Sequence, residues 1–168
     1  MIRNVHQRII RAGAGAVGAV LDSLSSEQDR LWPRRQWPSM RLDGPLGIGA
    51  SGGHGPVRYV VEEYEPGRTV RFRFTRPAGF RGHHAFRIAP APDESGVLLT
   101  HELTMTVVGS ARLTWPLFFR PLHDALIEES LDRAMTEVGD EPEVVAVRSL
   151  WVKTLRAVMS LPGQARSM

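Results

Sequence analysis

The chain changes its hydrophobic period once, near residue 110, and this change limits its fold more than any other feature. Between Val57 and Val108, apolar residues alternate with polar ones, as in strands with one buried and one exposed face. From Trp115 to Val138 the apolar residues recur at the 3.6-residue period of a helix. We therefore predict an α+β domain in which a curved antiparallel sheet wraps around one long helix.

Turn residues divide the alternating region into separate strands. Pro66 and Gly67 occupy the favoured central places of a turn between two of them. A first strand is indicated by the β-branched residues near the N-terminus, and the glycine-rich stretch 44–55 is expected to be a loop. The predicted strands are Ile2–Ile10, Met40–Asp43, Val57–Tyr64, Thr69–Thr75, Gly82–Ala89 and Val97–Val108.

Two short helices are predicted between the first two strands. The first covers Ala14–Leu24, and the second begins at a Ser25 cap and ends at Leu31. The long helix Trp115–Val138 would be about 36 Å long, which is enough to lie along a whole sheet. Pro116 and Pro121 make its first turns irregular.

A further amphipathic helix is predicted at Glu143–Leu161, after the break at Gly139–Pro142. We therefore divide the chain into a domain over residues 1–140 and an additional helix and tail over 141–168. Three placements of this helix fit the pattern: it packs back on the domain, it forms a homodimer contact, or it lies on a membrane surface. The small number of basic residues on its polar face argues against the membrane.

The order of elements and three short motifs resemble one known group of proteins. The motifs are Gly-Gly-His-Gly-Pro-Val-Arg-Tyr at Gly52–Tyr59, Tyr-Glu-Pro-Gly-Arg at Tyr64–Arg68, and Arg-Phe-Arg-Phe at Arg71–Phe74. Over residues 2–138 the chain resembles the START-like helix-grip superfamily, the SRPBCC group of polyketide cyclase/dehydrase and lipid-transport proteins. The resemblance implies a deep apolar pocket between sheet and helix. It supplies no catalytic residue, because the superfamily shares no single catalytic motif.

Composition and charge exclude several other classes. Without cysteine there is no disulfide and no thiolate site, and no apolar run reaches the 18–20 residues of a membrane-spanning helix. The net charge of +3 comes from scattered arginines, so we expect no nucleic-acid partner. Gly47–Gly52 matches G-x-G-x-x-G, but a strand follows it where a dinucleotide site needs a helix. We expect a cytoplasmic protein without a cofactor.

The histidines are the candidates for acid–base chemistry, because their ordinary pKa is near neutrality. His84 and His101 share strand phase with apolar residues, so both are expected to point into the cavity. They can act as general acid or base, or simply be buried and hydrogen-bonded. His54 is placed at the cavity entrance. A zinc site of His54, His84 and His101 is not supported by the spacing, and no metal is predicted.

The function expected from these features is binding of an apolar small molecule, such as a lipid, a polyketide or an aromatic compound. The alternative is a polyketide cyclase, aromatase or dehydratase that uses a cavity histidine. Pockets of this kind are mostly apolar with a few placed polar groups. The residues predicted to line the cavity are Trp32, Trp37, Tyr59, Phe72, Phe74, His84, Phe86, His101, Met105, Trp115, Phe118 and Leu122.

Overall fold

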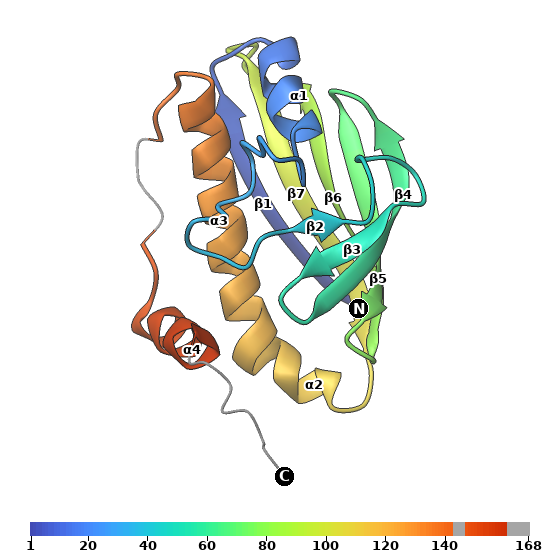
Figure 1. Cartoon of the computed structure of the whole chain (residues 1–168). Helices are drawn as coiled ribbons and strands as arrows, with labels where there is room; N and C mark the ends of the chain where they lie inside the picture. The colour runs from blue at the N-terminus through green and yellow to red at the C-terminus, as the bar shows by residue number, and fades with distance from the viewer. Residues whose placement is uncertain (143–146, 161–168) are drawn as a thin grey trace.

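The computed structural model describes residues 1–142 and 147–160. Its centre is one antiparallel sheet of seven strands in the order β1-β7-β6-β5-β4-β3-β2. The long helix packs against one face of this sheet, and the short helix α1 lies on the same side (Figure 1). The strands are β1 (Ile2–Ile10), β2 (Arg41–Leu42), β3 (Ser51–His54), β4 (Val57–Glu65), β5 (Thr69–Arg76), β6 (Phe80–Pro90) and β7 (Val97–Val107). The predicted α+β helix-grip architecture is confirmed.

Alternation along the strands decides which residues meet the helix. In β7, Leu99, His101 and Leu103 are buried, whereas the residues between them are partly exposed. In register, His101 lies opposite Phe86 of β6 on one side and opposite His6 of β1 on the other. The central strands therefore carry a row of buried side chains, and histidines are part of that row.

The glycine-rich stretch is not only a loop, because it contains strand β3, which the sequence did not predict. Here the neighbouring chains approach very closely. A Cβ atom built on Gly52 would lie 1.9 Å from the carbonyl oxygen of Arg41, and one on Gly53 would lie 1.9 Å from that of Val57. Glycine is therefore needed for strand pairing at this edge, although its β-propensity argues against a strand.

The first short helix forms as α1 (Ala14–Asp22), but the predicted second helix is wrong. Residues 23–31 form turns instead. Ser25 has a φ of 67°, which is left-handed, whereas a helix cap needs an extended conformation. The Asp29 carboxylate accepts hydrogen bonds from the backbone N–H groups of Ser25, Leu31 and Trp32, at 2.8–2.9 Å. These bonds stabilise the turns in place of helical hydrogen bonds.

The long helix is continuous over 27 residues and begins earlier than predicted. It consists of α2 (Ala111–Thr114), a π-helical segment (Trp115–Phe119) and α3 (Arg120–Glu137). The N–H of Arg120 bonds the carbonyl of Trp115 five residues earlier, as in a π-helix. Pro121 has no N–H to give to the Leu117 carbonyl. The irregular start expected from the two prolines is thus confirmed.

A last helix, α4 (Leu150–Ser160), packs against α3 in the same chain (Figure 1). Val152 and Leu155 are buried, and the indole N–H of Trp151 donates to the Leu117 carbonyl at 2.9 Å, the group that Pro121 leaves free. Arg156 stacks 4.6 Å above the Trp37 ring. The helix begins later than the predicted Glu143, because Val147 precedes it and is 88% exposed.

The start of the predicted helix, 143–146, and residue 161 lie outside the described residues. The contacts of α4 with α3 correspond to the first of the three placements considered above, in which this helix packs back on the domain. A homodimer contact through α4 stays a prediction. In the described residues, no helix is both long and apolar enough to cross a membrane.

Candidate functional site

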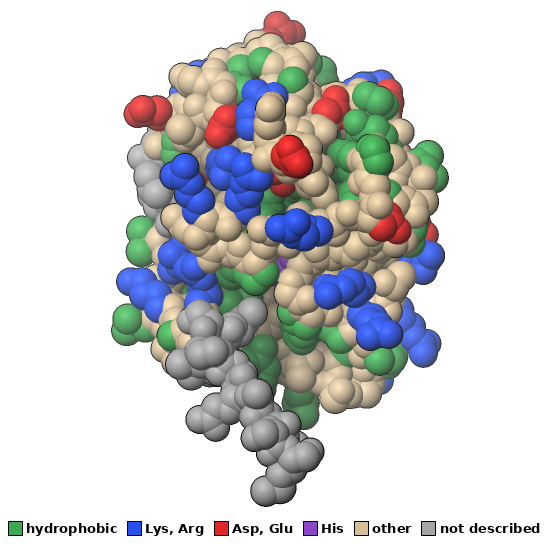
Figure 2. Space-filling view, viewed as in Figure 1, with side chains coloured by type: hydrophobic (Ala, Val, Ile, Leu, Met, Phe, Trp, Pro, Cys, Tyr) green, Lys and Arg blue, Asp and Glu red, His purple; other side chains and the backbone are tan. Residues whose placement is uncertain are grey.

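A cavity of about 460 Å³ lies between the sheet and the long helix, with an apolar lining. This volume is within the usual range for small-molecule sites. In the space-filling view, apolar side chains are visible in the recess below the centre of the face shown (Figure 2). The cavity is lined by Trp32, Trp37, Pro38, His54, Gly55, Pro56, Val57, Phe74, Phe80, His84, His101, Leu103, Trp115, Phe118, Phe119, Leu122, His123, Leu126, Ile127 and Leu155.

Eight of the twelve residues predicted to line the cavity do so, and four do not. The eight are Trp32, Trp37, Phe74, His84, His101, Trp115, Phe118 and Leu122. The remaining four, Tyr59, Phe72, Phe86 and Met105, are buried in the core beside the cavity. Three of these four support the cavity histidines, because the rings of Phe72 and Tyr59 lie 5.0 and 5.2 Å from His84, and Phe86 lies 4.6 Å from His101.

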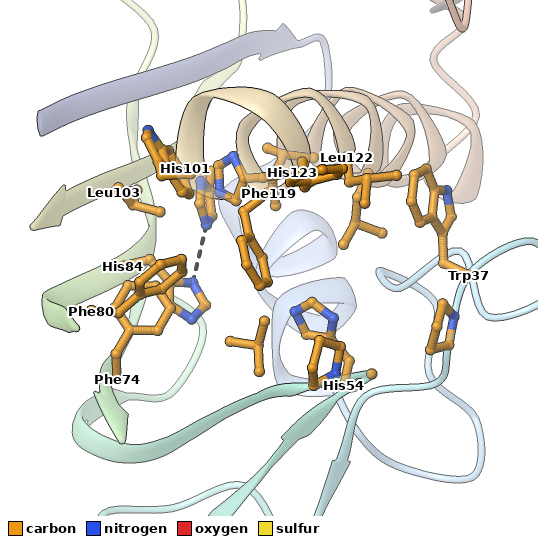
Figure 3. A pocket seen from close by; sticks show the side chains of 18 of the residues that line it. Trp37, His54, Phe74, Phe80, His84, His101, Leu103, Phe119, Leu122 and His123 are labelled. Carbon is orange, nitrogen blue, oxygen red and sulfur yellow. Dashed lines mark hydrogen bonds between the residues drawn. The ribbon is translucent and has the colours of Figure 1, made fainter. Parts of the chain in front are cut away.

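His84 and His101 come together as a hydrogen-bonded pair. They project from neighbouring strands β6 and β7, and Nδ1 of His84 lies 3.1 Å from Nε2 of His101 (Figure 3). The other nitrogen of each ring is buried and has no hydrogen-bond partner among the residues that the structure describes. Burial lowers the pKa of both histidines well below 6.5, and neighbouring histidines lower it further. Both rings are therefore neutral at pH 7, and each can donate or accept one hydrogen bond.

Two more histidines complete the polar part of the wall. His54 lies across the cavity from the pair, and His123 comes from α3 with its ring 5.1 Å from that of His101 (Figure 3). Burial, together with repulsion from His123 and Arg58, lowers the pKa of His54 to about 3. Burial also lowers the pKa of His123, although Asp124 opposes this effect. The cavity thus contains four neutral imidazoles in an apolar wall.

Behind His123, towards the surface, lies a second group of polar side chains. Asp124 Oδ1 is 3.3 Å from His123 Nδ1 and 3.3 Å from His6 Nε2. His6 Nδ1 is 2.5 Å from Glu128 Oε1, and Glu128 also binds Arg8. Burial alone would lower the pKa of His6, but its contacts with Asp124 and Glu128 outweigh burial and raise it. This outer group is therefore charged where the cavity group is neutral.

His6, His123 and Asp124 are the described residues that lie close enough together to share a metal ion. The trio of His54, His84 and His101 weighed from the sequence is not such a group in the described chain. His123 could have been found from the sequence. Together with Phe119, Leu122, Leu126 and Ile127, it lies at helical spacing, which puts it on the buried face. The part played by His6 depends on how β1 packs on α3, which no local pattern shows.

An apolar cavity between a curved antiparallel sheet and a long helix defines the START-like helix-grip fold. Solved structures with this fold match most of the chain at low sequence identity. A protein from Thermobifida fusca matches with a TM-score of 0.62 and 14% identity, over 85% of this chain and 99% of that one. The chain therefore has the helix-grip fold predicted from its sequence.

Two further structures, of the proteins StfQ and CalU16, also match the chain. The di-domain ARO/CYC StfQ from the steffimycin biosynthetic pathway matches with a TM-score of 0.61 and 13% identity, over 82% of this chain and 50% of that one. CalU16 from Micromonospora echinospora matches with a TM-score of 0.54 and 13% identity, over 94% and 83%. No protein-family model and no curated protein sequence matches the chain. These likenesses establish the fold.

Proposed function

We propose that the protein binds a small, uncharged and largely apolar molecule in the cavity between sheet and helix. The observation that carries this proposal is the lining itself. About 460 Å³ is enclosed by aromatic and aliphatic side chains, and no Asp, Glu, Lys or Arg is among the described residues that line it. Proteins with this fold typically bind hydrophobic ligands. A charged ligand would lose its hydration here without gaining an opposite charge.

The four imidazoles add a requirement for hydrogen bonding. The unpartnered nitrogens of His84, His101 and His123 are buried, and such groups are costly unless a partner is supplied. A ligand with a carbonyl or hydroxyl group would supply that partner. The rings of Phe74, Phe80 and Trp115 pack edge to face around the cavity, and such aromatic walls favour a flat, aromatic body. We therefore favour an oxygenated aromatic or polyketide-like compound among the hydrophobic ligands.

Filling the cavity tests this proposal directly. Leu122 lines the cavity, whereas Leu117 on the same long helix is 52% exposed and does not. Titration with the neutral fluorescent aromatic N-phenyl-1-naphthylamine should show saturable binding at one site. Leu122→Trp should weaken that binding at least tenfold, which is about 1.4 kcal/mol, and Leu117→Trp should leave it unchanged. Absence of saturable binding in the parent protein, or equal losses in both variants, would refute the proposal.

A second candidate function is catalysis by the histidine pair. His84 and His101 share one hydrogen bond inside the cavity and keep one free nitrogen each, so one ring can give a proton while the other receives one. StfQ, whose fold this chain shares, is an ARO/CYC of a biosynthetic pathway. The proposed reaction class is cyclisation, aromatisation or dehydration of a polyketide-like substrate. The free nitrogens of the pair are the observation that favours it.

Substitution of each histidine separates binding from catalysis. His84→Phe and His101→Phe keep the ring volume and remove the proton-carrying nitrogens. With a poly-β-ketone thioester as substrate, each variant should lose 10²- to 10⁴-fold in turnover, the usual contribution of a general acid or base. Binding of the fluorescent aromatic should be largely retained. If both variants turn the substrate over as the parent does, the pair has no catalytic part.

A further inference from the structure

A separate group of side chains on the outer side of His123 has the composition of a metal site. His6 comes from the edge strand β1, and His123 and Asp124 come from α3, which packs against β1. Asp124 Oδ1 lies 3.3 Å from His6 Nε2 and 3.3 Å from His123 Nδ1, and one ligand atom from each residue lies within 4.8 Å of the other two. We propose that His6, His123 and Asp124 form a binding site for a divalent transition-metal ion of the zinc class.

The two 3.3 Å spacings to Asp124 Oδ1 fit a shared ion better than they fit hydrogen bonds alone. A length of 3.3 Å is beyond the usual range of N–H···O bonds, about 2.7–3.2 Å. Tetrahedral zinc holds nitrogen at about 2.0–2.1 Å and carboxylate oxygen at about 2.0–2.2 Å, which places neighbouring ligand atoms about 3.3–3.4 Å apart. Two imidazoles and one carboxylate are a ligand set that suits zinc and similar ions.

The contacts around the three ligands hold them in the required orientation. His6 Nδ1 is 2.5 Å from Glu128 Oε1, so Nε2, which faces Asp124 Oδ1, is the ring nitrogen that would bind an ion. A carboxylate on the second nitrogen of a metal-binding histidine is a regular feature of such sites, because it fixes the tautomer and the ring. Glu128 is itself bound by Arg8. The ligand carboxylate is held by Asn4, whose Nδ2 donates to Oδ1 at 2.9 Å, and by Arg120, whose Nε lies 3.6 Å from Oδ2.

The position of the site links it to the cavity. The Asp124 side chain is 33% exposed, so an ion can enter from solvent, and three protein ligands leave a fourth position for water. His123 belongs to both, because it is one of the three ligands and its side chain also lines the cavity (Figure 3). An ion on its Nδ1 would place the ring proton on Nε2, which is buried and unpartnered. Metal occupancy would thus make His123 a fixed hydrogen-bond donor on the cavity side.

Direct metal titration of the full chain tests the proposal without any knowledge of the cavity ligand. After chelator treatment, calorimetry with Zn²⁺ should show one saturable site per chain. Co²⁺, used as a coloured substitute, should give the intense visible absorption of a tetrahedral ion. Asp124→Asn should weaken Zn²⁺ binding more than a hundredfold by removing the anionic ligand. Glu128→Gln should weaken it about 10- to 100-fold through the orientation of His6.

Matched controls distinguish this site from nonspecific binding to histidines and carboxylates. His83→Phe removes a partly exposed histidine from β6, and Glu137→Gln removes a carboxylate from the same helix; both should leave affinity unchanged. Circular dichroism should show that each variant is folded, and Glu128→Gln serves if Asp124→Asn does not fold. The proposal is overturned if the parent shows no saturable site, if the folded ligand variants bind as it does, or if the controls weaken binding equally.

Discussion

Two groups of histidines are separated only by the ring of His123, and they differ in charge: the cavity group is neutral, whereas the outer group is protonated. In the cavity, burial lowers the pKa of His84 and His101 well below 6.5, so both are neutral. On the outer side, contacts with Asp124 and Glu128 raise the pKa of His6 against the effect of burial. His123 lies between them, with its ring 5.1 Å from His101 and 5.9 Å from His6.

The difference shows that partners decide the charge more than depth does. The His6 side chain is only 12% exposed, yet two carboxylates keep its proton. His101 has no exposed surface and its hydrogen-bonded partner is another imidazole, which cannot compensate a charge. One face of α3 thus supplies Asp124 and Glu128 to the outer group, while another supplies His123 and apolar residues to the cavity. This separation lets an uncharged pocket and a charged cluster share one helix.

The largest effect is expected when a carboxylate is placed in the cavity, where all the described lining residues are neutral. His84→Asp would place a charge among the rings of Tyr59, Phe72 and Phe74, and no arginine or lysine is among the described residues that line the cavity. We expect a loss of about 3–5 kcal/mol in the free energy of unfolding, as for other unpaired buried charges. Urea unfolding at pH 7.5 measures it. His83→Asp, one residue away on the other face of β6, should cost no more than about 0.5 kcal/mol. Equal effects would contradict the charge-free cavity.

In the outer group the destabilising change is the loss of a carboxylate, and the expected fall in the free energy of unfolding is smaller. In the metal-free protein, Glu128→Gln removes the negative charge that faces both His6 and Arg8. Hydrogen bonds to charged groups contribute about 1.5–3 kcal/mol, so we expect the free energy of unfolding to fall by an amount in this range. The pKa of His6 should fall as well. Chemical unfolding and histidine NMR titration measure the two effects. Glu137→Gln, which weakens one partly exposed i,i+4 pair with Arg133, should change stability by about 0.5 kcal/mol or less. A Glu128→Gln variant as stable as this control would show that the outer cluster is not a stabilising unit.

Most of the sheet and the long helix were predictable because local periodicity determines them. Strand phase alone put His84 and His101 on the buried face. Strand β3 was missed since its glycines are explained by close approach to Arg41 and Val57, which is a contact between distant parts of the chain. The second short helix was wrongly predicted because Asp29 forms backbone turns that compete with a Ser25 helix cap.

The site was predictable only in part, for the same reason. His123 has a helical spacing that could have placed it on the cavity wall. His6, however, lies 118 residues from Asp124 in sequence, and the two meet because β1 packs on α3. Leu155 reaches the cavity because α4 folds back, although the sequence left three placements for that segment. Tyr59 and Phe72 were expected to line the cavity, but their rings pack against His84 in the core instead. Strand phase predicts which face of the sheet a side chain lies on, but not whether it reaches the cavity.

The smallest expected effect is a change in how the free energy of unfolding varies with pH. This one experiment compares the cavity histidines with His6 of the outer group. His84 and His101 are neutral when folded, but their ordinary pKa of 6.5 returns in the unfolded chain. Above pH 6.5 they contribute no pH dependence. As pH falls below 6.5, these histidines become protonated in the unfolded chain but stay neutral in the folded protein. Stability should therefore fall by about 1.4 kcal/mol per pH unit for each histidine.

His6 has the opposite sign: its raised pKa stabilises the fold below pH 6.5, and this contribution is lost as pH rises through the folded value. Urea unfolding of the metal-free protein between pH 6.5 and pH 5 should therefore give a shallower slope for His101→Phe than for the parent, by about the equivalent of one proton. If His101→Phe keeps the parent slope, His101 takes up its proton while folded, and the cavity does not exclude charge as the geometry of its wall requires.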